Sequence, residues 1–330
     1  MSADAFGIRL LRIPTPFAVG RVNCYLIDDD PLTLVDVGPN SGRSLDELVR
    51  ALAGHGRRVE DLERIVVTHQ HVDHLGLVGV LAARSGAEVC ALDRLAPVIA
   101  DFPAYAVRDD ELAQALMRRH GVPPDVVSVL AVVSAAFRGW AGSAPVTRPL
   151  PDGATLEFAG RTLEVLHRPG HSPSDTLFWD AERGVLIAGD HLIRHISSNP
   201  LIQRPLGGAS GEPGDGRPRA LMNYLRSLAQ TRQLPATLVL PGHGDPIDDH
   251  VALIDERFAM HERRARRLSR LVAEQPRSAY ELAQELWGNV AVTQAYLTLS
   301  EVLGHMDLLL ERGEVREAEL GGVVRFEPAG

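Results

Sequence analysis

The most informative feature of this chain is the segment Ile65-Val66-Val67-Thr68-His69-Gln70-His71-Val72-Asp73-His74. Its first three residues are β-branched and apolar, which favours a strand. Three histidines and one aspartate then follow within six residues, and a strand that ends there delivers their side chains to one edge of a sheet. Imidazole nitrogens and carboxylates are common ligands of zinc and iron. The segment therefore predicts a metal site, in which alternate residues surround one ion and the last histidine reaches a second. The candidate ligands are His69, His71, Asp73 and His74.

Three further apolar strands are predicted to end in the same kind of residue. They are Leu163–Leu166 before His171, Val185–Gly189 before Asp190, and Leu238–Leu240 before His243. A glycine directly precedes each of these residues, and glycine permits a sharp turn and a close approach of the backbone. One such residue alone is usually structural. Four strand ends of this type, in this order, indicate the remaining ligands of one metal site.

These motifs together resemble the metallo-β-lactamase superfamily over residues 8–250. The resemblance rests on seven His and Asp residues: His69, His71, Asp73, His74, His171, Asp190 and His243. Asp36, in Leu34-Val35-Asp36-Val37-Gly38, matches an early strand-end aspartate of the family. The resemblance implies an α+β fold, namely an αβ/βα sandwich in which two mixed sheets pack together with helices outside.

The resemblance also assigns a role to each ligand. It places one metal on three histidines: His69, His71 and His171. It places the other metal on Asp73, His74 and His243. It makes Asp190 the bridge between the two ions. No cysteine occupies a ligand position. A shell of histidine and aspartate accepts zinc, iron or manganese, and we expect two divalent ions, with zinc first.

Two metal ions about 3.5–4 Å apart lower the pKa of a shared water toward about 7 and polarise a carbonyl or phosphoryl oxygen. No protein nucleophile is then required, and the chain contains no Gly-x-Ser-x-Gly motif of a serine hydrolase. We therefore predict direct hydrolysis, with Asp73 and Asp190 as the catalytic carboxylates. Asp73 would be both a ligand and a proton acceptor.

The composition is that of a soluble globular protein, with 45% hydrophobic and 23% charged residues among 330. A net charge of −9 disfavours a dedicated nucleic-acid binder. Two cysteines, Cys24 and Cys90, do not suggest a disulfide framework. The N-terminal residues contain no secretory signal, and no apolar run is long enough to span a membrane. We expect a cytoplasmic protein without a membrane partner.

Residues 93–148 interrupt the alternation of strands and helices and predict a helical insertion. The stretch from Val126 to Phe137 is almost entirely apolar. The insertion is either a lid that binds an acyl or other apolar group, or a segment that packs against the sandwich or a dimer partner. Its aromatic and sulfur-containing candidates are Phe102, Tyr105, Met117, Phe137 and Trp140. A second irregular stretch, 197–218, follows Asp190 and can frame a pocket. Candidate orienting residues in and before it are His191, Arg194, His195, Asn199 and Arg204.

The last residues, 251–330, predict a separate module that resembles a winged helix. Long helices near 250–274 and 293–311 precede two short strands joined at Gly321-Gly322. Such a module follows the metal domain in a branch that resembles glyoxalase II-like proteins and β-lactamase-like protein 2. The helix at 293–303 has no Lys or Arg, and the module carries ten Arg against thirteen acidic residues. Nucleic-acid binding is therefore disfavoured, and packing against the metal domain or homodimerisation is expected.

The function predicted from these features is hydrolysis of a small ester, thioester or lactone, with an acyl-bearing substrate suggested by the apolar insertion. Two alternatives stay open. The first is a nuclease or phosphodiesterase with the same type of site. The second is a non-catalytic interaction or regulatory protein. Weak hydrolysis of β-lactams is compatible with the predicted site. The predicted division of the chain is a catalytic domain at 1–250 and a C-terminal domain at 251–330.

Overall fold

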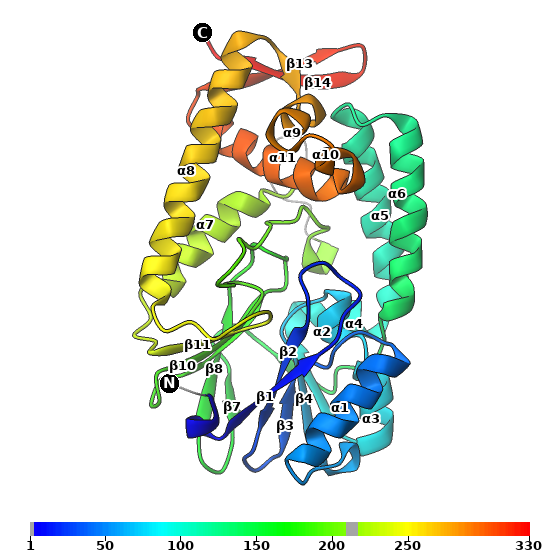
Figure 1. Cartoon of the computed structure of the whole chain (residues 1–330), viewed down its shortest axis with the longest axis vertical. Helices are drawn as coiled ribbons and strands as arrows, with labels where there is room; N and C mark the ends of the chain where they lie inside the picture. The colour runs from blue at the N-terminus through cyan, green and yellow to red at the C-terminus, as the bar shows by residue number, and fades with distance from the viewer. Residues whose placement is uncertain (1–2, 209–216) are drawn as a thin grey trace.

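Two mixed β-sheets form the lower half of the molecule (Figure 1). The computed structural model describes residues 3–208 and 217–330, so part of the irregular stretch 197–218 lies outside the described residues. The strands of the first sheet follow one another in chain order: β1 (Ile8–Ile13), β2 (Val22–Ile27), β3 (Thr33–Val35), β4 (Arg64–Val67), β5 (Glu88–Leu92) and β6 (Arg148–Leu150). The second sheet has the order β11 (Leu238–Pro241), β10 (Val185–Gly189), β9 (Thr176–Asp180), β8 (Thr162–His167) and β7 (Thr155–Glu157). Strands β3 to β6 run parallel, as do β10 and β11.

Alternate residues of one strand enter different hydrophobic cores. Val66 of β4 lies in the core between the sheets, together with Phe178 of β9 and Ile187 of β10. Its neighbour Ile65 lies in the core between the first sheet and the helices, together with Leu48. Successive side chains of a strand point to opposite faces, and here both faces are covered. This explains why the central strands are apolar at every position.

Helices cover the outer faces of both sheets, which confirms the predicted αβ/βα sandwich (Figure 1). The first sheet is covered by α1 (Gly42–Gly54), α3 (Val78–Ser85) and α4 (Ala96–Ala100). The second sheet is covered by α7 (Ala220–Thr231) and α8 (His250–Glu274). Helix α1 begins at Ser41, whose side chain accepts a hydrogen bond from the backbone N–H of Ser44. Such a cap satisfies one of the free N–H groups at a helix start.

The insertion at 93–148 consists mainly of helices. The two long ones are α5 (Phe102–Arg119) and α6 (Pro124–Phe137), which stand side by side and reach from the sandwich to the C-terminal module (Figure 1). At that far end, Leu116 and Met117 of α5 are buried in the core of the C-terminal module. The outer face of α6 leaves Val129 and Val132 exposed, at 62% and 71%. The insertion therefore joins the two ends of the molecule as well as flanking the sandwich.

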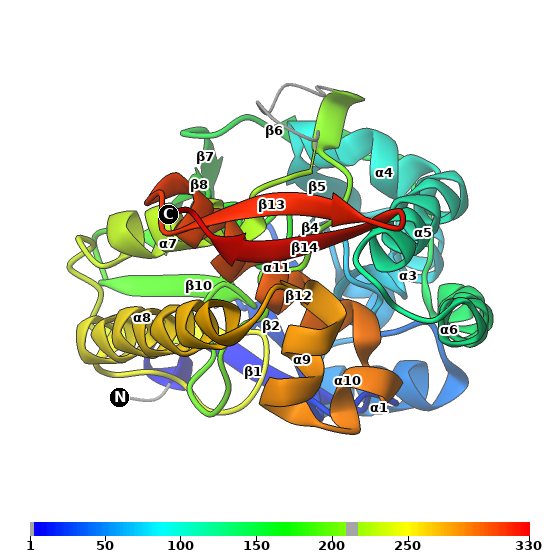
Figure 2. The ribbon, with the colours of Figure 1, turned by 90° about the horizontal axis from the view of Figure 1, so that it is seen from above.

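The C-terminal module combines three helices with a small sheet, as expected for an α+β chain (Figure 2). Its helices are α9 (Ala279–Trp287), α10 (Val290–Thr293) and α11 (Ala295–Glu311). Its sheet has the order β12 (Arg277–Ser278), β14 (Val323–Pro328) and β13 (Val315–Leu320). The predicted turn at Gly321-Gly322 joins β13 to β14, and both glycines have positive φ. Helix α11 is buried along most of its length and packs against α7, α8 and α9.

Among the described residues, none of the helices combines the length and the apolar character that crossing a bilayer requires.

Candidate metal centre

The seven predicted ligands meet at one edge of the sandwich, where strands from both sheets end. Residues 69–74 follow β4 and extend into the short helix α2 (Val72–Leu75). His171, Asp190 and His243 follow β8, β10 and β11 of the other sheet. Because loops from both sheets converge at this edge, side chains that are far apart in sequence become neighbours. The tertiary structure thus brings together all seven residues.

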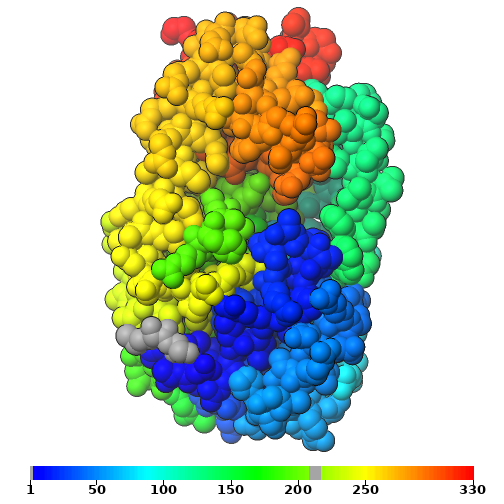
Figure 3. All heavy atoms as spheres, viewed as in Figure 1, coloured from blue at the N-terminus to red at the C-terminus, as the bar shows by residue number. Residues whose placement is uncertain are grey.

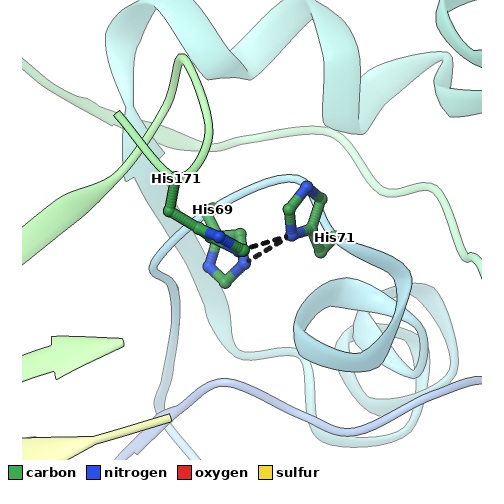
Figure 4. A group of neighbouring side chains, drawn as sticks. All are labelled: His69, His71 and His171. Carbon is green, nitrogen blue, oxygen red and sulfur yellow. Dashed lines mark hydrogen bonds between the residues drawn. The ribbon is translucent and has the colours of Figure 1, made fainter. Parts of the chain in front are cut away.

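Three histidines form the first group of the centre (Figure 4). His71 Nδ1 lies 3.1 Å from His69 Nε2 and 2.9 Å from His171 Nε2. The rings come from two separate loops and point toward a common position between them (Figure 4). Three ring nitrogens at this spacing are suited to one transition-metal ion.

The second group consists of Asp73, His74 and His243, with Asp190 between the two groups. His243 Nε2 lies 3.3 Å from Asp73 Oδ2 and 3.4 Å from Asp190 Oδ2. Asp190 also lies 3.4 Å from His74 Nε2 through Oδ1 and 3.6 Å from His171 Nε2 through Oδ2. Its carboxylate therefore contacts ligands of both groups, which is the position that a bridging ligand requires.

The outward nitrogen of each histidine contacts an oxygen. His74 Nδ1 donates to Asp36 Oδ2 at 2.7 Å, and His71 Nε2 donates to Gln203 Oε1 at 3.1 Å. The Nδ1 atoms of the other three histidines contact the Arg21 carbonyl, the Asn199 carbonyl and the Thr68 hydroxyl. These acceptors fix the proton on the outward nitrogen, so the inward nitrogen presents a bare lone pair. The Thr68 hydroxyl serves as an acceptor because its own proton goes to Asp36.

Asp36 holds His74 and Thr68 in place through hydrogen bonds to its carboxylate. Its carboxylate accepts hydrogen bonds from the Thr68 N–H and the Thr68 hydroxyl, both at 2.9 Å, in addition to His74. Its backbone has φ of 58°, the left-handed region that non-glycine residues rarely adopt. Strain of this kind persists where surrounding contacts hold the residue in place. The arrangement explains the strand-end aspartate noted in the sequence.

The donor set fits divalent cations. His74 Nε2, His243 Nε2 and Asp190 Oδ1 are buried and form no hydrogen bond within the described chain. Burial lowers the pKa of His243, but Asp190 and Asp73 outweigh it and raise that pKa to about 10. Burial lowers the pKa of His171 to about 3, and the neighbouring His71 ring adds to this decrease. The two carboxylates thus favour positive charge at one side of the centre, where a metal ion would replace the second proton of His243, and the other side offers neutral nitrogens.

Gly242 makes room for the bridging carboxylate. A Cβ atom at this position would lie 2.1 Å from Asp190 Oδ1 and 2.7 Å from His74 Cε1. Both distances are far below van der Waals contact, so any side chain would displace a ligand. The glycine before His243 is therefore required by close approach, as the sequence pattern indicated.

The segment 198–204, here called the strap, contacts three ligand residues. The Ser198 hydroxyl donates to the Asp190 carbonyl at 2.5 Å, and Asn199 and Gln203 accept from His171 and His71. Asn199 was a sequence candidate, although its backbone carbonyl rather than its side chain makes the contact. Gln203 was missed, because a glutamine within a loop carries no local signal.

The other candidates near Asp190 lie outside the centre. His191 is buried and its Nε2 contacts Thr231 Oγ1 at 2.9 Å, while Tyr224 donates to its carbonyl. Arg194 pairs with Asp248 at 3.1 Å on the surface. These residues support α7 and the following loops rather than the metal position.

Three aromatic side chains form a cluster, and the segment that carries Trp140 packs against α2. Phe17 lies 5.6 Å from Phe137 and 5.4 Å from Trp140 between ring centroids, and Phe137 stacks on Trp140. The Trp140 carbonyl accepts from the Asn40 N–H at 2.8 Å. Figure 3 shows a hollow where the blue loop between β1 and β2, the orange C-terminal helices and the green insertion face one another. Phe102 and Met117 are instead buried in hydrophobic cores.

The model of the metallo-β-lactamase superfamily matches residues 18–243, which is most of the chain. The chain belongs to this superfamily. Membership implies divalent metal ions and supports a hydrolase. The match ends at His243, the last of the seven residues in the centre.

Individual relatives agree with this assignment. The chain is 33% identical to a probable metallo-hydrolase of Bacillus subtilis, YqjP, over 96% of both chains. It is 25% identical to a β-lactamase-like protein 2 homolog of Caenorhabditis elegans, covering 79% of this chain and 68% of the relative. It is 24% identical to the hydroxyacylglutathione hydrolase GloC of Haemophilus influenzae, covering 69% and 88%. The predicted resemblance to these branches is confirmed.

A solved structure extends the likeness to the whole chain. A metallo-β-lactamase family protein of Thermus thermophilus superposes with a TM-score of 0.79 at 29% identity and covers 98% of each chain. The insertion and the C-terminal module are therefore within the region of likeness. Whether the C-terminal module functions as a winged helix stays a prediction.

Proposed function

We propose that this chain is a binuclear metal-dependent hydrolase of small acyl esters, thioesters or lactones. The observation that carries the proposal is the set of five inward-facing ring nitrogens and two carboxylates at one edge of the sandwich. Each of the five outward nitrogens has a hydrogen-bond acceptor, which leaves the inward lone pairs for metal. Zinc is the metal that we expect at this donor set, with iron or manganese as alternatives.

Two groups of residues would each bind one of the two metal ions. His69, His71 and His171 would hold one ion, and Asp73, His74 and His243 would hold the other. Asp190 would set the separation between the two positions. Bound ions supply a water of lowered pKa and polarise the scissile carbonyl. The side chains of His74 and His243 have no exposed surface, so charges in the site act with little screening by solvent.

Asp73 is the candidate proton acceptor. It stands at the start of α2, and His74 and His243 hold the pKa of its carboxyl below the ordinary value despite burial. An ionised carboxylate can take the proton of the attacking water and later deliver it to the leaving group. Because Asp73 also contacts His243, both roles follow from one position.

Support for an acyl substrate comes from the surroundings and from two relatives. Phe17, Phe137 and Trp140 offer aromatic surface beside α2, and Phe137 is 41% exposed. The relatives include the hydroxyacylglutathione hydrolase named above and an atrochrysone carboxyl ACP thioesterase of Aspergillus fumigatus. The acidic charge of the chain disfavours a polyanionic substrate.

The decisive experiment is a hydrolysis panel with protein of quantified metal content. It compares acyl esters, acyl thioesters, lactones, β-lactams and a phosphodiester. We expect turnover of acyl carbonyl compounds that rises with acyl length, loss of this turnover in Asp190→Ala, and none of that loss in Asp248→Ala. Asp248 is a suitable control because its side chain is 68% exposed.

Two results would contradict the proposal. Cleavage of the phosphodiester alone would make a phosphodiesterase or nuclease the better assignment. Protein that binds no metal, with no turnover of any compound, would favour a non-catalytic interaction protein.

A further inference from the structure

The strap at 198–204 adopts neither helix nor strand, yet it supplies partners to three ligand residues. Its backbone also receives support from the centre, since Leu201 N–H donates to the His171 carbonyl at 3.2 Å. A segment without its own hydrogen-bond ladder takes its position from the surfaces that hold it. The orientation of His71 and His171 therefore depends on what anchors the strap.

One anchor is helix α11 of the C-terminal module. The Tyr296 hydroxyl donates to the Ile202 carbonyl, and the Ile202 N–H donates to Ser300 Oγ at 3.4 Å. The side-chain amide of Asn199 donates to the Leu297 carbonyl at 2.9 Å. Ile202 itself is fully buried in the hydrophobic core of the module. The middle of the strap is therefore held in place mainly by hydrogen bonds and apolar packing with the C-terminal module.

The other anchor is helix α5 of the insertion. Asp109 accepts from the Gln203 side-chain amide at 3.3 Å and from the Arg204 N–H at 2.7 Å. Gln203 Oε1 meanwhile accepts from both His71 Nε2 and the Gln70 side-chain amide, each at 3.1 Å. Because the amide donates to a carboxylate, its oxygen must face His71. This contact fixes His71 so that Nδ1 points inward.

We propose that helix α11 is a positioning element of the metal centre, in which Tyr296 and Ser300 act through the strap on His71 and His171. The inference rests on the proposed metal site and deepens it. Two of the three histidines of the first group depend on the strap. The outward partners of His74 and His243 are Asp36 and the Arg21 carbonyl, which directly adjoin strands β3 and β2 of the first sheet. Tyr296 and Ser300 hold the strap at Ile202, between its contacts to His171 and His71. The Ser198 contact to the Asp190 carbonyl lies before this part of the strap. Loosening the strap at Ile202 should therefore weaken one metal position and leave the other.

Tyr296→Phe tests this link, because it removes one hydroxyl and no apolar surface. The affinities of the two metal positions are measured by chelator competition with zinc, and the ligand field is followed by the absorption of the cobalt(II) form. We expect about a tenfold loss of affinity at one position, toward the lower end of the effects known for outer partners of metal ligands. Gln203→Ala removes the acceptor itself and should lose about 10- to 100-fold at the same position.

Tyr280→Phe is the matched control. It makes the same chemical change in α9, where Tyr280 packs in the core of the same module. The control should keep both affinities and the cobalt spectrum. Ser300→Ala gives a second route to the same anchor if Tyr296→Phe does not fold.

The outcomes separate the inference from the proposed function. Selective weakening of one position in Tyr296→Phe and Gln203→Ala, at a melting temperature close to that of the control, supports the inference. Wild-type affinities and an unchanged spectrum in Tyr296→Phe and Ser300→Ala overturn it. Equal weakening of both positions with a matching fall in melting temperature also overturns it, since this is the result of general destabilisation. A wild-type chain that binds fewer than two ions would refute the proposed centre and the inference together.

Discussion

In the part of the chain that the structure describes, two clusters combine histidines with acidic residues, and they differ in which ring nitrogens carry protons. In the metal centre, bare ring nitrogens face one another and two carboxylates. In the C-terminal module, the cluster consists of His261, Glu301 and His305. There, His305 Nδ1 donates to the Glu301 carbonyl at 2.7 Å, so His305 Nε2 accepts from His261 Nδ1 at 3.2 Å. Arg264 pairs with the Glu301 carboxylate. In the second cluster, His261 donates to His305, His305 donates to the Glu301 carbonyl, and the negative charge of Glu301 is paired with Arg264.

The difference shows that close histidines and acids are insufficient to indicate a metal site. What matters is whether the outward nitrogen of each ring has an acceptor, because this decides which nitrogen is bare. All five rings of the metal centre meet that condition, whereas His261 does not. Its outward Nε2 is buried and has no hydrogen-bond partner among the described residues, and its Nδ1 donates to His305. We therefore expect two metal ions in this chain and none at the C-terminal cluster.

The largest expected effect is the loss of a ligand in the metal centre. His71→Ala should lose one ion and reduce turnover by about 10³-fold or more, because a catalytic metal contributes several kcal/mol to transition-state stability. The variant should stay folded by circular dichroism, since His71 lies at the edge of the sandwich. His55→Ala, at an exposed position, is the control and should resemble the wild type. Wild-type turnover of His71→Ala at matched metal content would show that the site is wrongly placed.

The equivalent change in the second cluster should affect stability instead. His305→Ala leaves a cavity in the core and removes the acceptor of His261, so we expect a loss of about 2–4 kcal/mol in the free energy of unfolding. Chemical denaturation measures this loss, and metal analysis should still give two ions. A fall in bound metal would mean that the two clusters are alike.

Crowding the metal centre should have an intermediate effect. Gly242→Ala places a methyl group against Asp190 and His74, so metal affinity should fall by about 10- to 100-fold, as for the loss of an outer partner. Gly54→Ala, which meets nothing within 4 Å at the end of α1, is the control. Unchanged metal affinity in Gly242→Ala would mean that the bridging carboxylate sits elsewhere in solution.

Over one pH unit, the smallest expected effect is the pH dependence of the second cluster. Burial lowers the pKa of His261 from 6.5 to about 4, so between these values the unfolded chain binds a proton that the folded chain does not. Stability therefore decreases as pH falls through this window, by at most about 1.4 kcal/mol per pH unit for one proton. His261→Gln removes this contribution, and denaturation curves from pH 7 to 4 should show a shallower loss than in the wild type. An identical slope would indicate that His261 is protonated in the folded protein.

Most secondary structure was predictable from local patterns. The strands at β1, β2, β4 and β5, the long helix α8 and the terminal hairpin follow from apolar runs and turn glycines. Strand β9 (Thr176–Asp180) was not predicted, although all five of its residues are buried. Its sequence mixes polar and aromatic residues, and Asp180 is paired with Arg183 across the turn and with the distant Arg161. Local periodicity does not reveal such a strand.

Local sequence patterns were sufficient to assign the family, the sandwich and the seven candidate ligands, because each ligand follows an apolar strand or a turn glycine at short range. Only the tertiary structure decided which nitrogen of each histidine faces inward, since the acceptors come from distant segments such as Asp36 and Gln203. It also decided that α11 holds the strap beside the centre and that His261 donates to His305 rather than leaving the facing nitrogens bare. The residue type alone decides whether a side chain can bind a metal. The direction in which a histidine lone pair points depends instead on the hydrogen-bond partners around the ring, and these come from distant parts of the sequence.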